Sequence, residues 1–212
     1  YMPHSYQAND SEKKISKRIF TKKELGLPED SFVFCCFNQS YKINPETFDL
    51  WIEILTNVNK SVLWLFETDS VSTKNLKKEI KIRGLDPSRI IFAKKMPLSD
   101  HLARHQLADL SIDSFPYTTG VTCSDALWTS LPVLTRIGNS FASRMAASLL
   151  TAIDLPEMIV KTKKEYKDLA IELATDKKKL NQIKNKLKKN RLTTPLFDTK
   201  LFKENIEELY LT

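Results

Sequence analysis

Short apolar runs alternate with longer amphipathic stretches along the first 160 residues of the chain. The apolar runs predict buried strands at residues 32–37, 62–66, 89–93, 109–113 and 132–135. Apolar residues at helical spacing predict helices over residues 45–58, 72–82, 99–108, 122–130 and 142–152. Strands joined by crossover helices are typical of a parallel sheet, so the pattern predicts a Rossmann-like α/β fold.

After Pro156 the pattern changes almost entirely to helices. A short strand is predicted at residues 158–160, and helices are predicted over residues 163–174, 176–191 and 199–210. We therefore divide the chain into a linker and entry segment (1–30), a Rossmann-like core (31–161) and a helical C-terminal tail (162–212). The polar opening stretch, which begins with Tyr1 and contains Pro3, is typical of a linker, so we expect a piece of a longer protein.

The composition fits a globular domain in a reducing compartment. With 212 residues, of which 42% are hydrophobic and 28% charged, the chain is long enough to bury a core. No run approaches the roughly 20 apolar residues that span a bilayer, and no signal peptide is recognisable, so no membrane partner is expected. The three cysteines, of which Cys35 and Cys36 are adjacent, form neither a disulfide pattern nor a zinc pattern, and we expect a cytoplasmic location.

The net charge of +7 favours anionic partners. Much of the excess lies in residues 176–191, where Leu180, Ile183 and Leu187 recur at helical spacing among lysines. We interpret this stretch as a helix with one buried and one solvated face. Binding of RNA or DNA is the alternative, but nucleic acid is not the partner we expect.

Polar residues gather in the loops that follow the predicted strands, where open α/β sheets bind their ligands. Gln39 and Lys42 follow the first strand, and this lysine could neutralise phosphate while the glutamine donates a hydrogen bond. His101 and Arg104 are spaced to share one face of a helix whose start is marked by Ser99 or Asp100. An imidazole can stack on a nucleobase and a guanidinium can hold it, although either group can also be an ordinary surface residue.

The stretch PYTTGVTCSDALW, residues 116–128, leads from the fourth strand into a helix. Thr122 followed by Asp125 resembles a capping box for that helix. Alternatively, the helix N-terminus receives a diphosphate, Gly120 allows close approach of the backbone, and Asp125 binds ribose hydroxyls. The local sequence is compatible with both interpretations.

Several common sites are not indicated. The chain has no P-loop, no G-x-G-x-x-G fingerprint and no G-x-S-x-G elbow. Its three histidines have no carboxylate at ligand spacing, so we predict no metal site and no cofactor. The residues alone therefore indicate a domain that binds a nucleotide-like anion.

Longer motifs occur in a characteristic order. The segments FVFCCFNQSYKINPETFDLWIEIL, HLARHQLADLSIDSFPYTTGVTCSDALW and TPLFDTKLFKENIEELY together resemble the C-terminal catalytic lobe of the O-GlcNAc transferase and SPINDLY family. The resemblance runs over nearly the whole chain. It implies one lobe of a two-lobed GT-B glycosyltransferase, which transfers a sugar from a nucleotide to Ser or Thr hydroxyls of proteins with inversion and without a metal.

The resemblance also implies roles for individual residues. Lys42 would stabilise the leaving diphosphate, which makes it the catalytic candidate. The donor nucleotide would contact side chains or backbone N–H groups of Gln39, His101, Arg104, Gly120, Val121, Thr122 and Asp125. Within this set, His101 and Arg104 would lie beside the base, Gln39 and Thr122 beside the phosphates, and Asp125 beside the ribose.

Departures from the family pattern leave the donor open. Animal members carry His-Thr-Thr where this chain has Gly120, Val121 and Thr122, and they carry Lys at Leu98. We expect UDP-GlcNAc as the donor substrate; GDP-fucose, as used by SPINDLY-type members, and a non-catalytic nucleotide-binding or interaction module are the alternatives.

The expected partners, besides the acceptor protein, are an N-terminal catalytic lobe and tetratricopeptide repeats of the same polypeptide. The last helix, with Leu201, Phe202, Ile206 and Leu209 on one face, is expected to pack on that lobe. Alone, the 212 residues are expected to bind the donor weakly and not to catalyse transfer.

Overall fold

A six-stranded parallel sheet forms the centre of the computed structural model, which describes residues 2–211; residues 1 and 212, the outer ends of the predicted entry segment and tail, lie outside the described part. The strands run in the order β3-β2-β1-β4-β5-β6. They are β1 (Phe32–Cys36), β2 (Ser61–Phe66), β3 (Ile90–Ala93), β4 (Leu110–Ile112), β5 (Val133–Arg136) and β6 (Ile159–Val160). All paired neighbours are parallel, so the predicted Rossmann-like fold is confirmed.

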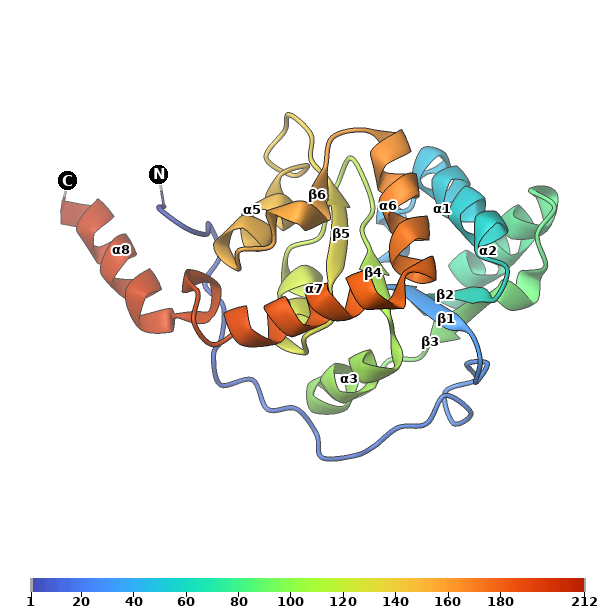
Figure 1. The fold of residues 1–212 in the computed structure, drawn as a ribbon, viewed down its shortest axis with the longest axis horizontal. Coiled ribbons are helices and arrows are strands. Elements are labelled where there is room, and N and C mark those ends of the chain that lie inside the picture. The colour runs from blue at the N-terminus through green and yellow to red at the C-terminus, as the bar shows by residue number, and fades with distance from the viewer. Residues whose placement is uncertain (1, 212) are drawn as a thin grey trace.

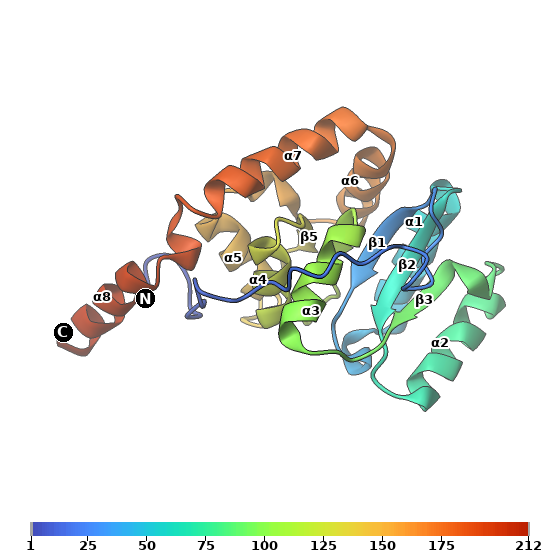
Figure 2. The same ribbon diagram turned by 90° about the horizontal axis from the view of Figure 1, so that it is seen from below.

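Helices cover both faces of the sheet (Figures 1 and 2). Their bounds are α1 (Pro45–Asn57), α2 (Ser70–Ile82), α3 (Leu98–Arg104), α4 (Val121–Trp128), α5 (Met145–Ala152), α6 (Lys163–Thr175), α7 (Lys177–Asn190) and α8 (Thr199–Leu211). Helices α1 and α6 lie side by side, whereas α3 and the N-terminal segment lie on the other side of the sheet. Helix α8 extends away from the rest of the molecule (Figure 1).

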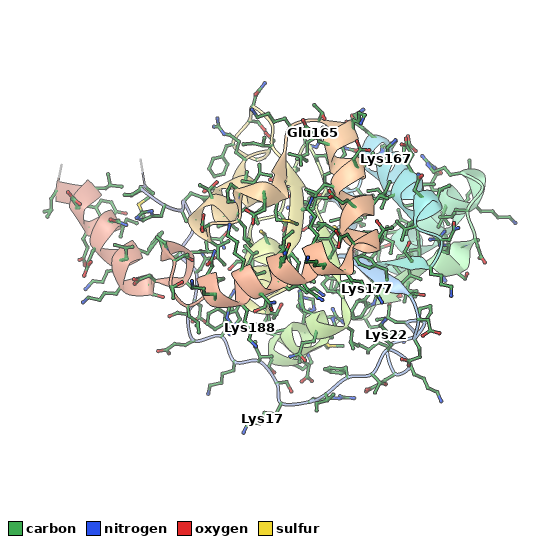
Figure 3. All side chains as sticks on the ribbon, viewed as in Figure 1. Lys17, Lys22, Glu165, Lys167, Lys177 and Lys188 are labelled. Carbon is green, nitrogen blue, oxygen red and sulfur yellow. The ribbon has the colours of Figure 1, made fainter. Side chains whose placement is uncertain are left out.

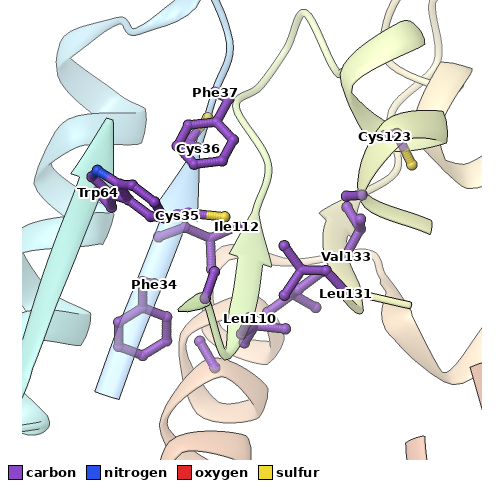
Figure 4. Close-up of a cluster of buried hydrophobic side chains, with 14 of the residues drawn as sticks. Phe34, Cys35, Cys36, Phe37, Trp64, Leu110, Ile112, Cys123, Leu131 and Val133 are labelled. Carbon is purple, nitrogen blue, oxygen red and sulfur yellow. The ribbon is translucent and has the colours of Figure 1, made fainter. Parts of the chain in front are cut away.

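The core lies where the central strands meet the helices. Strand β1 is buried from Val33 onward, and Figure 4 shows its Cys35 beside Trp64 of β2 and Ile112 of β4, with Phe34 further along the strand. Burial on both faces explains why the central strands are runs of apolar residues. The adjacent Cys35 and Cys36 are free thiols inside this core, and burial raises the pKa of both.

Five of the eight helices in the described part of the chain begin one to three residues from the predicted positions, and in α3 and α5 the preceding loop explains the difference. The expected start of α3 at Ser99 or Asp100 is wrong, because the helix begins at Leu98 directly after Pro97 and has no side-chain cap. Helix α5 begins at Met145, after a turn in which Ser140 and Ser143 bond to each other. In both cases the loop geometry determines the boundary, and periodicity does not reveal it.

The lysine-rich helix α7 buries the predicted apolar stripe. Leu180, Ile183 and Leu187 are buried, as expected for a helix with one solvated face. On the outer side, Lys179 pairs with Glu172 and Lys186 pairs with Glu157. Figure 3 shows Lys177 and Lys188 at the two ends of this helix. None of the helices formed by residues 2–211 has the length and apolar character that a membrane span requires.

Candidate functional site

A hollow of about 280 Å³ lies at the carboxyl edge of the sheet, between the loop after β1 and the start of α4. Five of the eight predicted site residues line it: Gln39, Lys42, Gly120, Val121 and Thr122. Residues that the sequence did not single out complete the wall: Tyr6, Gln7, Asn38, Tyr41, Tyr117 and Met145. The fold therefore joins the loop after β1 to the loop after β4, which are separated by more than seventy residues in the sequence.

Lys42 is the cation of this hollow. Its side chain is half-buried, its Nζ donates to the carbonyl oxygen of Thr118 at 3.2 Å, and the ammonium lies 3.9 Å from the centre of the Tyr117 ring. Burial lowers its pKa, while the buried carboxyl of Asp113 acts in the opposite direction. Gln39 is exposed beside it. A partly desolvated lysine next to an exposed amide can bind an anion strongly.

Helix α4 begins at the hollow, but the predicted capping box is wrong. Gly120 precedes the first helical residue, and neither Thr122 nor Asp125 caps the helix. Instead, the hydroxyl of Thr119 accepts a hydrogen bond from the backbone N–H of Cys123 at 3.1 Å. The capping side chain therefore lies three residues earlier than the sequence pattern indicated, because the chain enters the helix through the loop after β4.

Asp125 does not line the hollow. It is 7% exposed, and its carboxylate pairs with Lys13 Nζ at 2.6 Å. The N-terminal segment is fixed here, since Trp128 donates from its indole nitrogen to the Lys13 carbonyl at 3.0 Å. A Cβ placed on Gly120 would lie 2.6 Å from the Tyr6 hydroxyl. Glycine at this position therefore makes room for the N-terminal segment.

His101 and Arg104 come together in a buried group away from the walls of the hollow. Arg104 is 1% exposed and donates to the Lys94 carbonyl at 2.6 Å and to His101 Nδ1 at 2.5 Å. His105 bonds through Nδ1 to the His101 carbonyl at 2.7 Å, and the Phe37 ring lies 5.1 Å from each imidazole. Because His101 accepts from a guanidinium, its ring is neutral, and burial lowers the pKa of His101 to about 3 and that of His105 to about 4.

Asp113, at the end of β4, is the main site residue that sequence reasoning missed. It is 1% exposed, and burial raises the pKa of its carboxyl group to about 7. A charged residue that closes an apolar strand at the ligand-binding edge was the available signal. No comparable signal marks Tyr6, Gln7 or Lys13, which reach the site only through the path of the N-terminal segment.

Within residues 2–211 the structure groups no three His, Cys, Asp or Glu side chains in a way that could hold a metal ion. The chemistry available at the hollow is that of one ammonium group, a helix N-terminus and several polar side chains. Such a set recognises a phosphate-bearing ligand.

Comparison with solved structures shows which proteins the chain resembles in fold. The chain superposes on an O-GlcNAc transferase mutant, K341M, from Thermobaculum terrenum with a TM-score of 0.81 and 32% identity, covering 85% of this chain and 35% of that one. A UDP-bound MnaA structure from S. aureus matches with a TM-score of 0.52 at 14% identity, which shows a shared fold alone.

Comparison with curated sequences gives longer matches. A UDP-N-acetylglucosamine–peptide N-acetylglucosaminyltransferase from Caenorhabditis elegans is 40% identical over 207 residues, which cover 97% of this chain. The SEC protein of Arabidopsis thaliana is 36% identical, and a SPINDLY protein of Hordeum vulgare is 31% identical. The chain spans only 18–22% of the length of these three relatives. The family model for glycosyl transferase family 41 matches residues 3–206, and the chain therefore belongs to this family.

Proposed function

We propose that this chain is the donor-binding lobe of an inverting, metal-independent protein O-glycosyltransferase that takes GlcNAc from UDP-GlcNAc. The observation that carries the proposal is the convergence of Lys42 and the α4 N-terminus on one hollow in a family 41 chain. The three named relatives support this donor, because the name of each describes a UDP-N-acetylglucosamine–peptide transferase.

The diphosphate lies between Lys42 and the first residues of α4 in this proposal. The first N–H groups of a helix have no intrahelical partner, so those of Val121 and Thr122 are available to phosphate oxygens. As the bond to the sugar breaks, negative charge grows on the departing diphosphate. Lys42 offsets that charge, and its partial burial strengthens the interaction.

Asp125 binds the ribose only if Lys13 moves or shares the carboxylate. The 2.6 Å ion pair occupies one oxygen of Asp125, Oδ1. An ammonium that shares this carboxylate would still leave Oδ2 for a ribose hydroxyl. We therefore keep Asp125 as the ribose contact and assign Lys13 as its neighbour.

The residues that face the acceptor protein and the group that activates its hydroxyl belong, in this proposal, to another lobe of the same polypeptide. Helix α8 supplies a surface for that lobe. None of its described residues is buried, although Leu201, Phe202 and Ile206 form an apolar stripe. An apolar helix face that projects from the domain is stabilised when a second domain covers it.

Calorimetric titration with UDP and with GDP tests the proposal. We expect saturable UDP binding that Lys42→Ala weakens about tenfold through loss of a charge-assisted hydrogen bond. Asp125→Ala should also weaken binding, and Lys13→Ala is the matched control, because it removes the other half of the same ion pair.

The two nucleotides separate the donor alternatives. Preference for GDP would replace UDP-GlcNAc with GDP-fucose, the donor of SPINDLY-type members. Binding that Lys42→Ala does not change would show that the hollow is not the donor site, and binding that Asp125→Ala does not change would contradict its role as the ribose contact.

A further inference from the structure

Asp113 lies directly beneath the hollow. A small crevice beside the hollow is lined by Asn38, Asp113, Thr119 and Thr122 among others, and it shares Asn38 and Thr122 with the hollow. Asp113 therefore lies next to the proposed diphosphate site, with Asn38 and Thr122 lining both cavities.

Donors surround the Asp113 carboxylate. Oδ1 accepts from the backbone N–H of Thr119 at 3.0 Å, and Oδ2 accepts from the hydroxyl of Thr135 at 2.7 Å. Asn38 adds a longer contact to Oδ1 at 3.4 Å. Because each oxygen receives a donor, the arrangement fits the ionised carboxylate. The backbone is fixed as well, since the Tyr166 hydroxyl donates to the Asp113 carbonyl at 2.8 Å.

Through its hydrogen bond with Thr119, this carboxylate fixes the loop that contacts both the start of α4 and Lys42. The Thr119 hydroxyl caps α4 by accepting from Cys123 N–H at 3.1 Å. The neighbouring Thr118 carbonyl accepts from Lys42 Nζ at 3.2 Å. The position of Lys42 and the direction of the α4 N-terminus therefore both depend on the loop that Asp113 holds.

We propose that Asp113 is a positioning residue that holds residues 118–122 in the conformation that receives the donor diphosphate, and that diphosphate binding makes Asp113 take up a proton from solvent. The inference rests on the proposed function, because the anion is the donor diphosphate.

The charges around Asp113 explain the proton uptake. The titratable groups that face it are Cys36 of β1, Lys42 after β1, Cys123 of α4 and Tyr166 of α6. Burial raises the pKa of both thiols and of the phenol, so these groups stay neutral near pH 7. A diphosphate beside Lys42 offsets the positive charge of Lys42, which favours the Asp113 carboxylate, and adds negative charge, so the carboxyl group, with a pKa of about 7, gains a proton.

Proton uptake is measured by UDP titration at pH 7 in PIPES and in Tris, whose ionisation enthalpies differ. We expect the wild-type chain to take up more protons per UDP than Asp113→Asn, and we expect the variant to bind UDP about tenfold more weakly. Asp109→Asn is the matched control, because it makes the same chemical change at the opposite end of β4, where Asp109 accepts from Val33 N–H. The control should leave both values unchanged.

Amide hydrogen exchange in the absence of nucleotide tests whether Asp113 fixes the loop. Amides of residues 119–123 should exchange at least about tenfold faster in Asp113→Asn than in Asp109→Asn. If Asp113→Asn does not fold, the protection of these amides, relative to their intrinsic exchange rates, is measured in the wild-type chain between pH 6 and 8 instead.

The two measurements distinguish the possible failures. Equal exchange, equal affinity and equal proton uptake in wild type and Asp113→Asn would overturn the inference. Faster loop exchange in Asp113→Asn, together with a wild-type chain that binds no UDP, would uphold the positioning role and contradict both the proton uptake and the proposed function.

Discussion

Two basic groups lie near the carboxyl edge of the sheet, and they are built in opposite ways. Lys42 is half-buried and faces an open hollow with its ammonium bonded to one carbonyl oxygen. Arg104 is 1% exposed; its two terminal nitrogens donate to the Lys94 carbonyl and to His101, while its Nε is buried without a hydrogen-bond partner. Only the first group is arranged to receive an external anion.

The two cations show that a position near the ligand-binding edge of the sheet does not determine whether the side chain faces outward or inward. Lys42 lies in the segment after β1, and Arg104 ends helix α3, which follows β3, so both groups come from segments that follow parallel strands. Helix α3, however, starts directly after Pro97 and turns Arg104 inward, where its guanidinium lies 5.0 Å from the Phe37 ring. The resemblance to the family places His101 and Arg104 beside the base. In this structure their visible contacts are internal to the protein.

The largest effect is expected when each cation is replaced by alanine in turn. Arg104→Ala should lower the free energy of unfolding by about 3 kcal/mol, because hydrogen bonds and packing on Phe37 and Trp64 are lost. Lys42→Ala should cost about 1 kcal/mol or less, because the side chain is only half-buried. Urea unfolding measures both values, and equal losses would show that the two cations have similar structural roles.

The second prediction concerns acid stability of the buried group. The pKa of His105 is lowered to about 4, so the folded chain binds fewer protons than the unfolded chain, in which histidine titrates near its usual value of 6.5. This stabilising term is fully present above pH 6.5 and is lost as the pH falls toward 4; between pH 6.5 and pH 5 the loss is about 2 kcal/mol.

Urea unfolding of wild type and His105→Gln at pH 7, 6 and 5 measures this loss. The stability advantage of the wild type should shrink with falling pH. His4→Gln, at an exposed position, is the control and should follow the wild type. A pH-independent difference between wild type and His105→Gln would contradict the assignment.

The smallest effect is expected for a substitution at Val121, which lines the hollow. Val121 is 64% exposed at the first position of α4 and offers no hydrogen bond from its side chain. Val121→Thr replaces a methyl group with a hydroxyl group and leaves the shape of the side chain nearly unchanged, so UDP affinity should rise by about fivefold or less. Thermal unfolding should not change. Unaltered affinity would indicate that backbone N–H groups alone contact the phosphate at this position.

The alternation of apolar and amphipathic segments predicted which segments form strands and placed most helix bounds to within a few residues. It succeeded because buried parallel strands and two-faced helices have different periodicities. The predicted helix starts were wrong where a side chain in the preceding loop determined them, as at Thr119 before α4 and at Ser140 and Ser143 before α5.

The candidate site was only partly visible in the sequence. Gln39, Lys42 and residues 120–122 could be found, because they follow strands directly. Lys13 could not, since it reaches Asp125 across 112 residues of sequence. Asp113 was included in a strand, although its carboxyl group organises the loop above it.

By itself, the sequence determined the fold class, the family resemblance and the edge of the sheet where polar loops gather, because these depend on periodicity and on motifs within continuous segments. The tertiary structure alone decided which of the predicted residues share a hollow, which are buried against Phe37 and which one pairs with Lys13. Those outcomes depend on side-chain burial and on contacts between distant segments, which form only when the chain is folded.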